Sequence, residues 1–175
     1  MSPLPTAFWV VAAVLLFWAV GAYNRLVRLR NVILLRFVPV DQQLALRSEL
    51  LQRQIDALAA QPDAAARELE ALRAARAQVD AAWEAARRRP GAVGAINSLR
   101  VALQILAQVR ERRAAEAAGA PELARLHTDL AACDNALRFA QGQFNDAVQE
   151  YNAAVGQFPT GLLAAMFQFR GAVPL

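Results

Sequence analysis

Residues 5–23 read PTAFWVVAAVLLFWAVGAY, an apolar stretch without a single charged side chain. At the helical rise of 1.5 Å per residue, residues 3–22 span roughly 30 Å, the thickness of a bilayer core. Trp9, Trp18 and Tyr23 are aromatic residues of the kind that gather at membrane interfaces. We therefore predict a transmembrane anchor over residues 1–22, in contact with the lipid bilayer. Its membrane-facing side chains are expected to be Phe8, Trp9, Val10, Val11, Val14, Leu15, Leu16, Phe17, Trp18 and Val20.

A cleaved signal peptide is the rival interpretation of this stretch. Signal peptides normally begin with positive charge, whereas MSPLP at residues 1–5 contains neither Lys nor Arg. Val20, Gly21 and Ala22 do form a weak cleavage motif. The sequence favours the retained anchor, and with it a single-pass protein of a bacterial-type inner membrane.

A basic cluster follows the anchor directly, and it consists of Arg25, Arg28, Arg30 and Arg36. Positive charge is retained on the cytoplasmic side of membranes, so the cluster predicts an outside N-terminus and a cytoplasmic domain. The same charges suit anionic lipid head groups, which attract basic residues by roughly 1 kcal/mol each near the surface. The net charge of +4 would also suit nucleic acid. Nucleic-acid binding is not expected, because no aromatic interleaving and no known motif supports it.

The rest of the chain has the pattern of an all-α protein. Apolar residues recur at helical spacing, and no segment alternates with a period of two. We predict helices over 23–60, 63–89, 93–118 and 122–156, separated by short segments rich in Pro and Gly. Short loops join antiparallel neighbours, so residues 23–156 should fold as an up-and-down helical bundle of coiled-coil-like character.

Individual residues refine this prediction. Pro39 removes a backbone donor and should kink or restart the first helix near Val38. Asp63 is the expected N-cap of the second helix. His127 is expected at the boundary of the core rather than as a ligand. The residues expected to be buried along the last two helices are Leu103, Leu106, Leu130, Cys133 and Leu137.

Two stretches carry a family resemblance, YNRLVRLRN at residues 23–31 and FNDAVQEYNAAVGQFPTGLLAAMFQF at residues 144–169. The second is similar to the C-terminal pattern of the LemA family, in which a Tyr-Asn pair and a Phe-Pro pair precede a Leu-Ala-x-x-Phe-x-Phe run. The matching residues are Tyr23, Asn24, Asn145, Tyr151, Asn152, Phe158, Pro159, Leu163, Ala164, Phe167 and Phe169. Pro39 and Gln168 depart from the family pattern, so the chain resembles a divergent member.

The resemblance implies a membrane-anchored helical domain and implies no known activity. The chain has one His and one Cys, and it lacks a phosphate-binding loop and a nucleophile elbow. We therefore expect no enzyme, no cofactor and no metal site. The expected function is a non-enzymatic scaffold that binds the membrane surface, an unknown protein partner or both, with a homo-oligomer left open. The alternative is a periplasm-facing coiled-coil component of an envelope complex.

Residues 157–175 form an apolar C-terminal segment that is too short to span a bilayer. In an up-and-down bundle the fourth helix returns this segment towards the membrane. One interpretation places it at the bilayer, close to Tyr23 and to the face of Arg25 and Arg28. The other makes it a cap on the bundle core. The residues concerned are Leu162, Leu163, Met166, Phe167 and Phe169.

Overall fold

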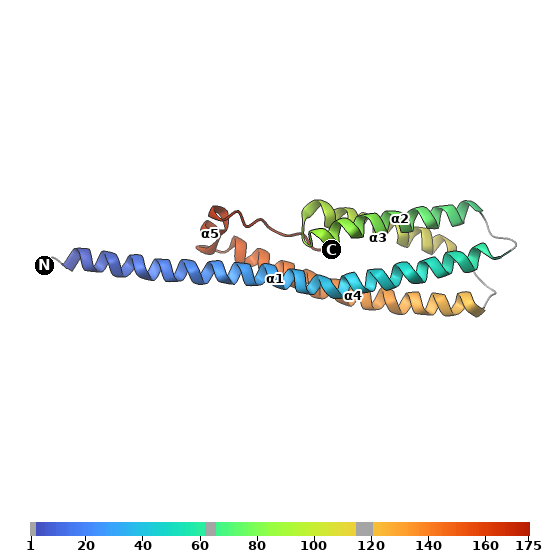
Figure 1. Ribbon diagram of the computed structural model, residues 1–175, viewed down its shortest axis with the longest axis horizontal. Coiled ribbons are helices and arrows are strands. Elements are labelled where there is room, and N and C mark those ends of the chain that lie inside the picture. Colours follow the sequence, from blue (N-terminus) through green and yellow to red (C-terminus); the bar gives the residue numbers. More distant parts are fainter. Residues whose placement is uncertain (1–2, 62–65, 115–120) are drawn as a thin grey trace.

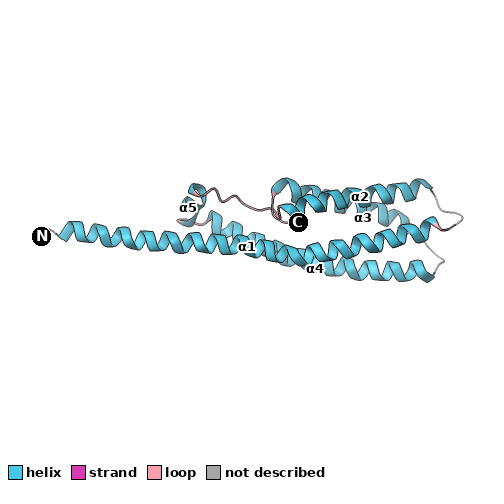
Figure 2. Ribbon diagram, viewed as in Figure 1, coloured by secondary structure: helices cyan, strands magenta, loops and turns pink. Residues whose placement is uncertain are grey.

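The computed structural model describes residues 3–61, 66–114 and 121–175, and all regular structure in these residues is helical (Figure 2). The helices are α1 (Pro3–Ala59), α2 (Ala66–Arg88), α3 (Val93–Ala114), α4 (Pro121–Gly156) and α5 (Thr160–Met166). The prediction of an all-α chain with an apolar N-terminal helix is confirmed. Two details lie outside the described residues, namely the N-cap at Asp63 and the end of the third predicted helix at 115–118.

α1 is one continuous helix of 57 residues, about 85 Å long at the standard rise. The predicted restart near Val38 is wrong, because α1 passes through Pro39 without ending. Phe37 and Val40, which flank the proline, are both buried against the other helices, whereas Pro39 itself is exposed. Tertiary packing of an apolar stripe stabilises a helix more than local propensity does. The buried neighbours therefore hold the helix together across a residue that disfavours it.

The helices run up and down as predicted, in an arrangement with a long pair and a short pair (Figure 1). α4 lies antiparallel beside α1, α2 lies beside α3, and α2 also contacts α1. The turn between α2 and α3 stops halfway along the long pair (Figure 1). Gly91 makes this turn with a φ of +86°, a backbone conformation that residues with a side chain rarely adopt.

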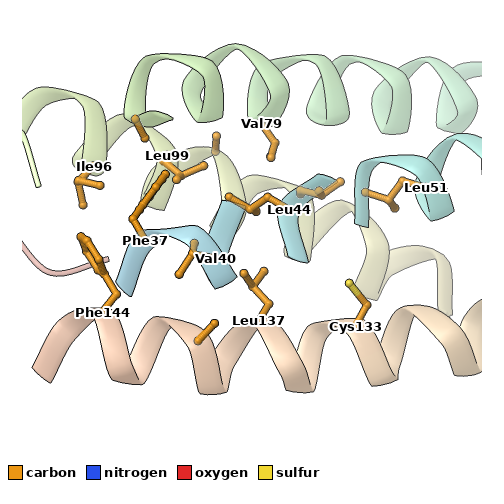
Figure 3. Packing of buried hydrophobic residues seen from close by; sticks show 14 of the residues in the cluster. Phe37, Val40, Leu44, Leu51, Val79, Ile96, Leu99, Cys133, Leu137 and Phe144 are labelled. Carbon is orange, nitrogen blue, oxygen red and sulfur yellow. The ribbon is translucent and has the colours of Figure 1, made fainter. Parts of the chain in front are cut away.

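The core is an apolar seam to which the four bundle helices, α1 to α4, all contribute (Figure 3). The rings of Phe37 on α1 and Phe144 on α4 meet edge to face with their centroids 5.7 Å apart. Of the residues predicted to be buried, Leu106, Leu130, Leu137 and Cys133 lie in this core. Leu103 is only partly buried, so its prediction is wrong, and the reason is a cleft beside it that is described below.

The C-terminal segment turns back after α4. α5 packs on both α1 and α4. The chain then runs without regular structure from Phe167 towards the turn between α2 and α3, where the C-terminus lies (Figure 1). This segment thus occupies the side of the long pair that the short pair leaves open.

Candidate functional site

The N-terminal part of α1 stands alone, beyond the reach of the other helices (Figure 1). It is the one helix in the described part of the chain that is long and apolar enough to cross a membrane. No part of this apolar window is buried within the protein. All ten residues predicted to face the membrane are exposed large hydrophobic side chains. Such a surface is characteristic of contact with lipid or another apolar phase rather than with water.

The arginines of the basic cluster lie at different distances from Tyr23, which ends the apolar stretch. All four arginines are exposed. Measured along α1 from Tyr23, Arg25 and Arg28 lie within about 8 Å, whereas Arg36 lies about 20 Å away. Arg36 instead donates a hydrogen bond from Nη1 to Oε1 of Gln143 on α4, at 2.9 Å. Because charge at a membrane surface is screened within about 10 Å, Arg36 belongs to the contact between α1 and α4 rather than to a lipid-facing surface.

An apolar foot, defined here as Phe158, Leu162, Met166 and Phe167, projects beside the start of the bundle. All four side chains are exposed, and Met166 is 74% exposed. The opposite face of α5 buries Thr160 and Ala164. The foot is therefore the outward face of α5 and its flanks, while the inward face covers the bundle.

The foot lies at the end of the anchor. The ring of Tyr23 meets the rings of Phe167 and Phe169 edge to face, at centroid distances of 5.0 and 5.7 Å. The structure thus brings the C-terminal segment to Tyr23, as the docking interpretation required. Leu163 and Phe169 are partly buried, so part of the segment also caps the bundle.

Two asparagines of the family motif form a clamp on the C-terminal chain. Asn152 donates from Nδ2 to the carbonyl of Ala172 at 2.8 Å and accepts the Ala172 N–H at 2.9 Å. Asn145 makes the same pair of bonds with Leu175, at 3.0 and 2.7 Å. The two asparagines are seven residues apart, so they lie on one face of α4 about two turns from each other.

Other groups complete the clamp. Tyr151 donates its hydroxyl hydrogen to the carbonyl of Arg170 at 3.0 Å, and burial raises the pKa of this phenol. The N–H of Val173 donates to the carbonyl of Gly91 at 3.2 Å, which ties the tail to the turn between α2 and α3. The motif residues Tyr151, Asn152 and Asn145 therefore hold backbone in place. Asn24, the remaining polar residue of the motif, is exposed on α1.

A polar cleft between α3 and α4 was not predicted. Arg47 and Gln54 of α1, Arg110 of α3 and Asp134 of α4 are among the residues that line it. Asp134 contacts Nε of Arg47 at 2.8 Å and Nη1 of Arg110 at 2.6 Å. Burial lowers the pKa of the Arg47 guanidinium, and the nearby Asp134 carboxylate opposes that effect.

A signal for this cleft exists in the sequence. The buried stripe of α1 includes Val40, Leu44, Leu51 and Leu58, at steps of four and seven residues. A strict heptad continues that stripe through positions 47 and 54, where Arg and Gln stand instead of apolar residues. Polar residues at two seam positions one heptad apart indicate a polar site inside the bundle.

Cys133 and His127 have side chains of reactive types, but their surroundings indicate a structural role. Cys133 is buried, its Sγ lies 3.4 Å from the carbonyl oxygen of Gln43, and burial raises the pKa of its thiol. His127 is partly buried at the edge of the cleft, close to its predicted boundary position. Within the described ranges, no group of His, Cys, Asp and Glu residues is arranged to hold a metal ion.

A protein-family model matches most of the chain. The model of the LemA family matches residues 36–173, which include α2 to α5 and the part of α1 from Arg36 onward but exclude the anchor, residues 23–35 and the last two residues of the chain. A search of curated proteins found no match.

Proposed function

The chain belongs to the LemA family, and from this premise we propose that it is a membrane-anchored helical scaffold whose bundle is held against the membrane surface. The observation that carries the proposal is the continuity of α1. A single helix contains both the exposed apolar stretch and the buried seam of the bundle. Because no flexible linker separates the two parts, the orientation of the anchor also sets the orientation of the bundle.

The position of the foot supports contact with the bilayer. Ala7 and Tyr23 are about 24 Å apart along α1, so a bilayer core that covers the apolar stretch ends near Tyr23. Phe167 and Phe169 are in contact with Tyr23, and the exposed residues of the foot lie beside them. Arg25 and Arg28 come next along the helix, at the depth of lipid head groups. This order of apolar, aromatic and basic groups is the order found across a membrane interface.

The bundle is placed in the cytoplasm in this proposal. Arg25 and Arg28 follow the anchor closely, and positive charge favours retention on the cytoplasmic side. The opposite orientation would make the same fold a periplasmic component of an envelope complex. An alkaline phosphatase fused after Leu175 distinguishes the two. We expect the fusion to be inactive, whereas strong periplasmic activity would reverse the orientation.

The proposed role is non-enzymatic. The charged groups that converge in the cleft are already engaged with one another, since Asp134 contacts both Arg47 and Arg110. The Cys133 thiol is buried, and its raised pKa disfavours the thiolate that nucleophilic catalysis requires. What the arrangement supports is a rigid body with binding surfaces.

A charge inserted into the anchor tests the membrane attachment. The double substitution Val14→Asp and Leu15→Asp should move the chain from the membrane pellet to the soluble fraction, because each Asp at the centre of a span costs about 2.5–3.5 kcal/mol. Phe139→Asp is the matched control, since Phe139 is an exposed apolar residue on α4, outside the anchor. Retention of the double variant in membranes after carbonate washing would contradict the proposal.

A further inference from the structure

The charge of the chain is divided unevenly along its length. Residues 23–40 and 151–175 contain five arginines and neither Asp nor Glu, which gives them a net charge of +5. Residues 41–150 carry all fifteen acidic residues and fourteen arginines, a net charge of −1. The two basic segments are far apart in sequence, but α5 packs on α1 and brings them together at the start of the bundle (Figure 1). The positive net charge of the protein therefore comes from the part of the bundle nearest the apolar stretch.

Arg170 joins the arginines of α1 through the returning C-terminal segment. It follows Phe169, whose ring lies 5.7 Å from that of Tyr23, and its carbonyl accepts the hydrogen bond of the Tyr151 hydroxyl. Burial raises the pKa of the Tyr151 phenol, and the charge of Arg30 opposes this effect. Arg30 also stands seven residues after Tyr23, two helical turns along the same side of α1. Arg30 and Arg170 therefore share the side of α1 on which the C-terminal segment lies.

Arg25 and Arg28 lie on the other side of α1. At 100° per residue they are rotated by about 200° and 140° from Tyr23. Together with Arg30 and Arg170 they form a basic collar, a name used here for these four arginines, around α1 where the apolar stretch ends. Along α1, the three collar arginines of this helix lie within about 10 Å of Tyr23, the distance over which charge acts in physiological salt.

The guanidinium groups of the basic collar are available to a ligand. All four residues are exposed, and within the described ranges none of them is in an ion pair. Farther along the bundle, by contrast, Arg47, Arg76 and Arg110 pair with carboxylates. Glu150 on α4 is the acidic residue that directly precedes the C-terminal basic segment. One carboxylate is too few to neutralise four guanidinium groups, so the collar keeps a positive charge.

We propose that the basic collar binds anionic phospholipid head groups, so that the protein gathers anionic lipids around its anchor. A phospholipid combines an anionic phosphate with apolar chains, and the collar lies beside the exposed apolar side chains of the foot. Clusters of four or more basic residues directly beyond a membrane span are typical of binding to anionic lipid. This inference rests on the proposed membrane attachment and names the class of lipid that the attached protein selects.

The test measures which lipids surround the anchor, through the fluorescence of Trp18, which brominated acyl chains quench on contact. The full chain is reconstituted into vesicles of phosphatidylcholine with a minor fraction of phosphatidylglycerol. Bromine is carried either by the phosphatidylglycerol or by an equal amount of the phosphatidylcholine. We expect phosphatidylglycerol to be enriched about fivefold around the chain, the factor for one contact between an arginine and an anionic lipid. The enrichment should shrink as salt is added, because salt screens the attraction.

Two double variants with the same change in net charge locate the binding. Arg28→Gln with Arg170→Gln should reduce the enrichment to about half or less, because it removes half of the collar. Arg112→Gln with Arg125→Gln is the matched control, since both residues are exposed and lie outside the collar. It should leave the enrichment unchanged. Arg170→Gln preserves the clamp, because Tyr151 binds the carbonyl of Arg170 and not its side chain.

Equal quenching by the two brominated lipids would overturn the inference, and so would equal losses of enrichment in the two double variants. Enrichment that does not respond to salt would overturn it as well, because charge would then not be its cause. If neither brominated lipid quenches the fluorescence, the anchor is not in the bilayer, and the proposed membrane attachment fails together with this inference. Equal quenching refutes the lipid selection alone and leaves the attachment standing.

Discussion

Asn152 holds the C-terminal chain through two hydrogen bonds between its side-chain amide and the backbone of Ala172. Asn152→Leu removes both bonds, and each typical bond contributes about 0.5–1.5 kcal/mol, so we expect a loss of about 1–3 kcal/mol in the free energy of unfolding. Cleavage of the tail by a protease should accelerate as well. Asn135→Leu is the control, because Asn135 is exposed on the same helix and, among the described residues, bonds only to nearby Arg138. Equal stability and equal proteolysis of the two variants would show that the clamp contributes nothing.

Leu130 is fully buried in the seam, whereas Arg112 is exposed on α3. Leu130→Ala leaves a cavity and should lower the free energy of unfolding by about 2–5 kcal/mol. Arg112→Ala should change it by no more than about 0.5 kcal/mol. Chemical denaturation of the detergent-solubilised chain, followed by circular dichroism, measures both values. Similar midpoints for the two variants would mean that the buried and exposed faces are assigned wrongly.

Residue patterns predicted most of the core, and their failures have physical causes. Leu106, Leu130, Leu137 and Cys133 lie where the helical spacing placed them. Leu103 does not, because burial depends on a facing helix and α3 leaves a cleft there. The motif asparagines could be recognised from sequence, but their hydrogen bonds to the C-terminal backbone could not be predicted. A side chain that bonds to backbone imposes no requirement on the sequence of the segment that it holds.

Pro39 shows how packing overrides local preference at the scale of the helix. Pro in a helix interior costs about 3 kcal/mol relative to Ala, because it lacks a donor and its ring meets the preceding turn. Pro39→Ala should therefore raise the free energy of unfolding, by up to about 3 kcal/mol. Leu35→Ala, at an exposed position of the same helix, should have little effect. Thermal unfolding checks both, and a lower melting temperature for Pro39→Ala would indicate that the bundle requires proline at this position.

Helix positions were predictable because the apolar period and the breaks at Pro and Gly are local signals. The unbroken passage from anchor to bundle was not predictable, because Phe37 and Val40 stabilise α1 only through partners distant in sequence. The same holds for α5. Apart from Thr160, its side chains are apolar, so the side that faces inward is decided by the contacts of α5 with α1 and α4.

The whole molecule combines an exposed apolar N-terminal helix, which we propose to be the membrane anchor, with a bundle and a C-terminal foot that returns to this helix. The up-and-down order and the helix lengths predicted that return, and the contacts of Tyr23 with Phe167 and Phe169 agree with it. The polar cleft was overlooked because it arises from the relative placement of α3 and α4. In the sequence, only the polar residues at seam positions 47 and 54 indicate this cleft.

The depth of the foot in the bilayer tests the central claim most directly. Met166 and Phe139 are almost equally exposed in the protein, at 74% and 71%, but only Met166 lies beside the anchor. Nitroxide labels at Met166→Cys and Phe139→Cys, both in a Cys133→Ala background, can be compared in lipid nanodiscs. Electron paramagnetic resonance then measures their collisions with oxygen, which concentrates in lipid, and with a water-soluble nickel complex.

We predict that the label at position 166 collides mainly with oxygen, and the label at position 139 mainly with the nickel complex. If both labels are equally accessible to the nickel complex, the foot lies in water and the bundle is not held against the membrane.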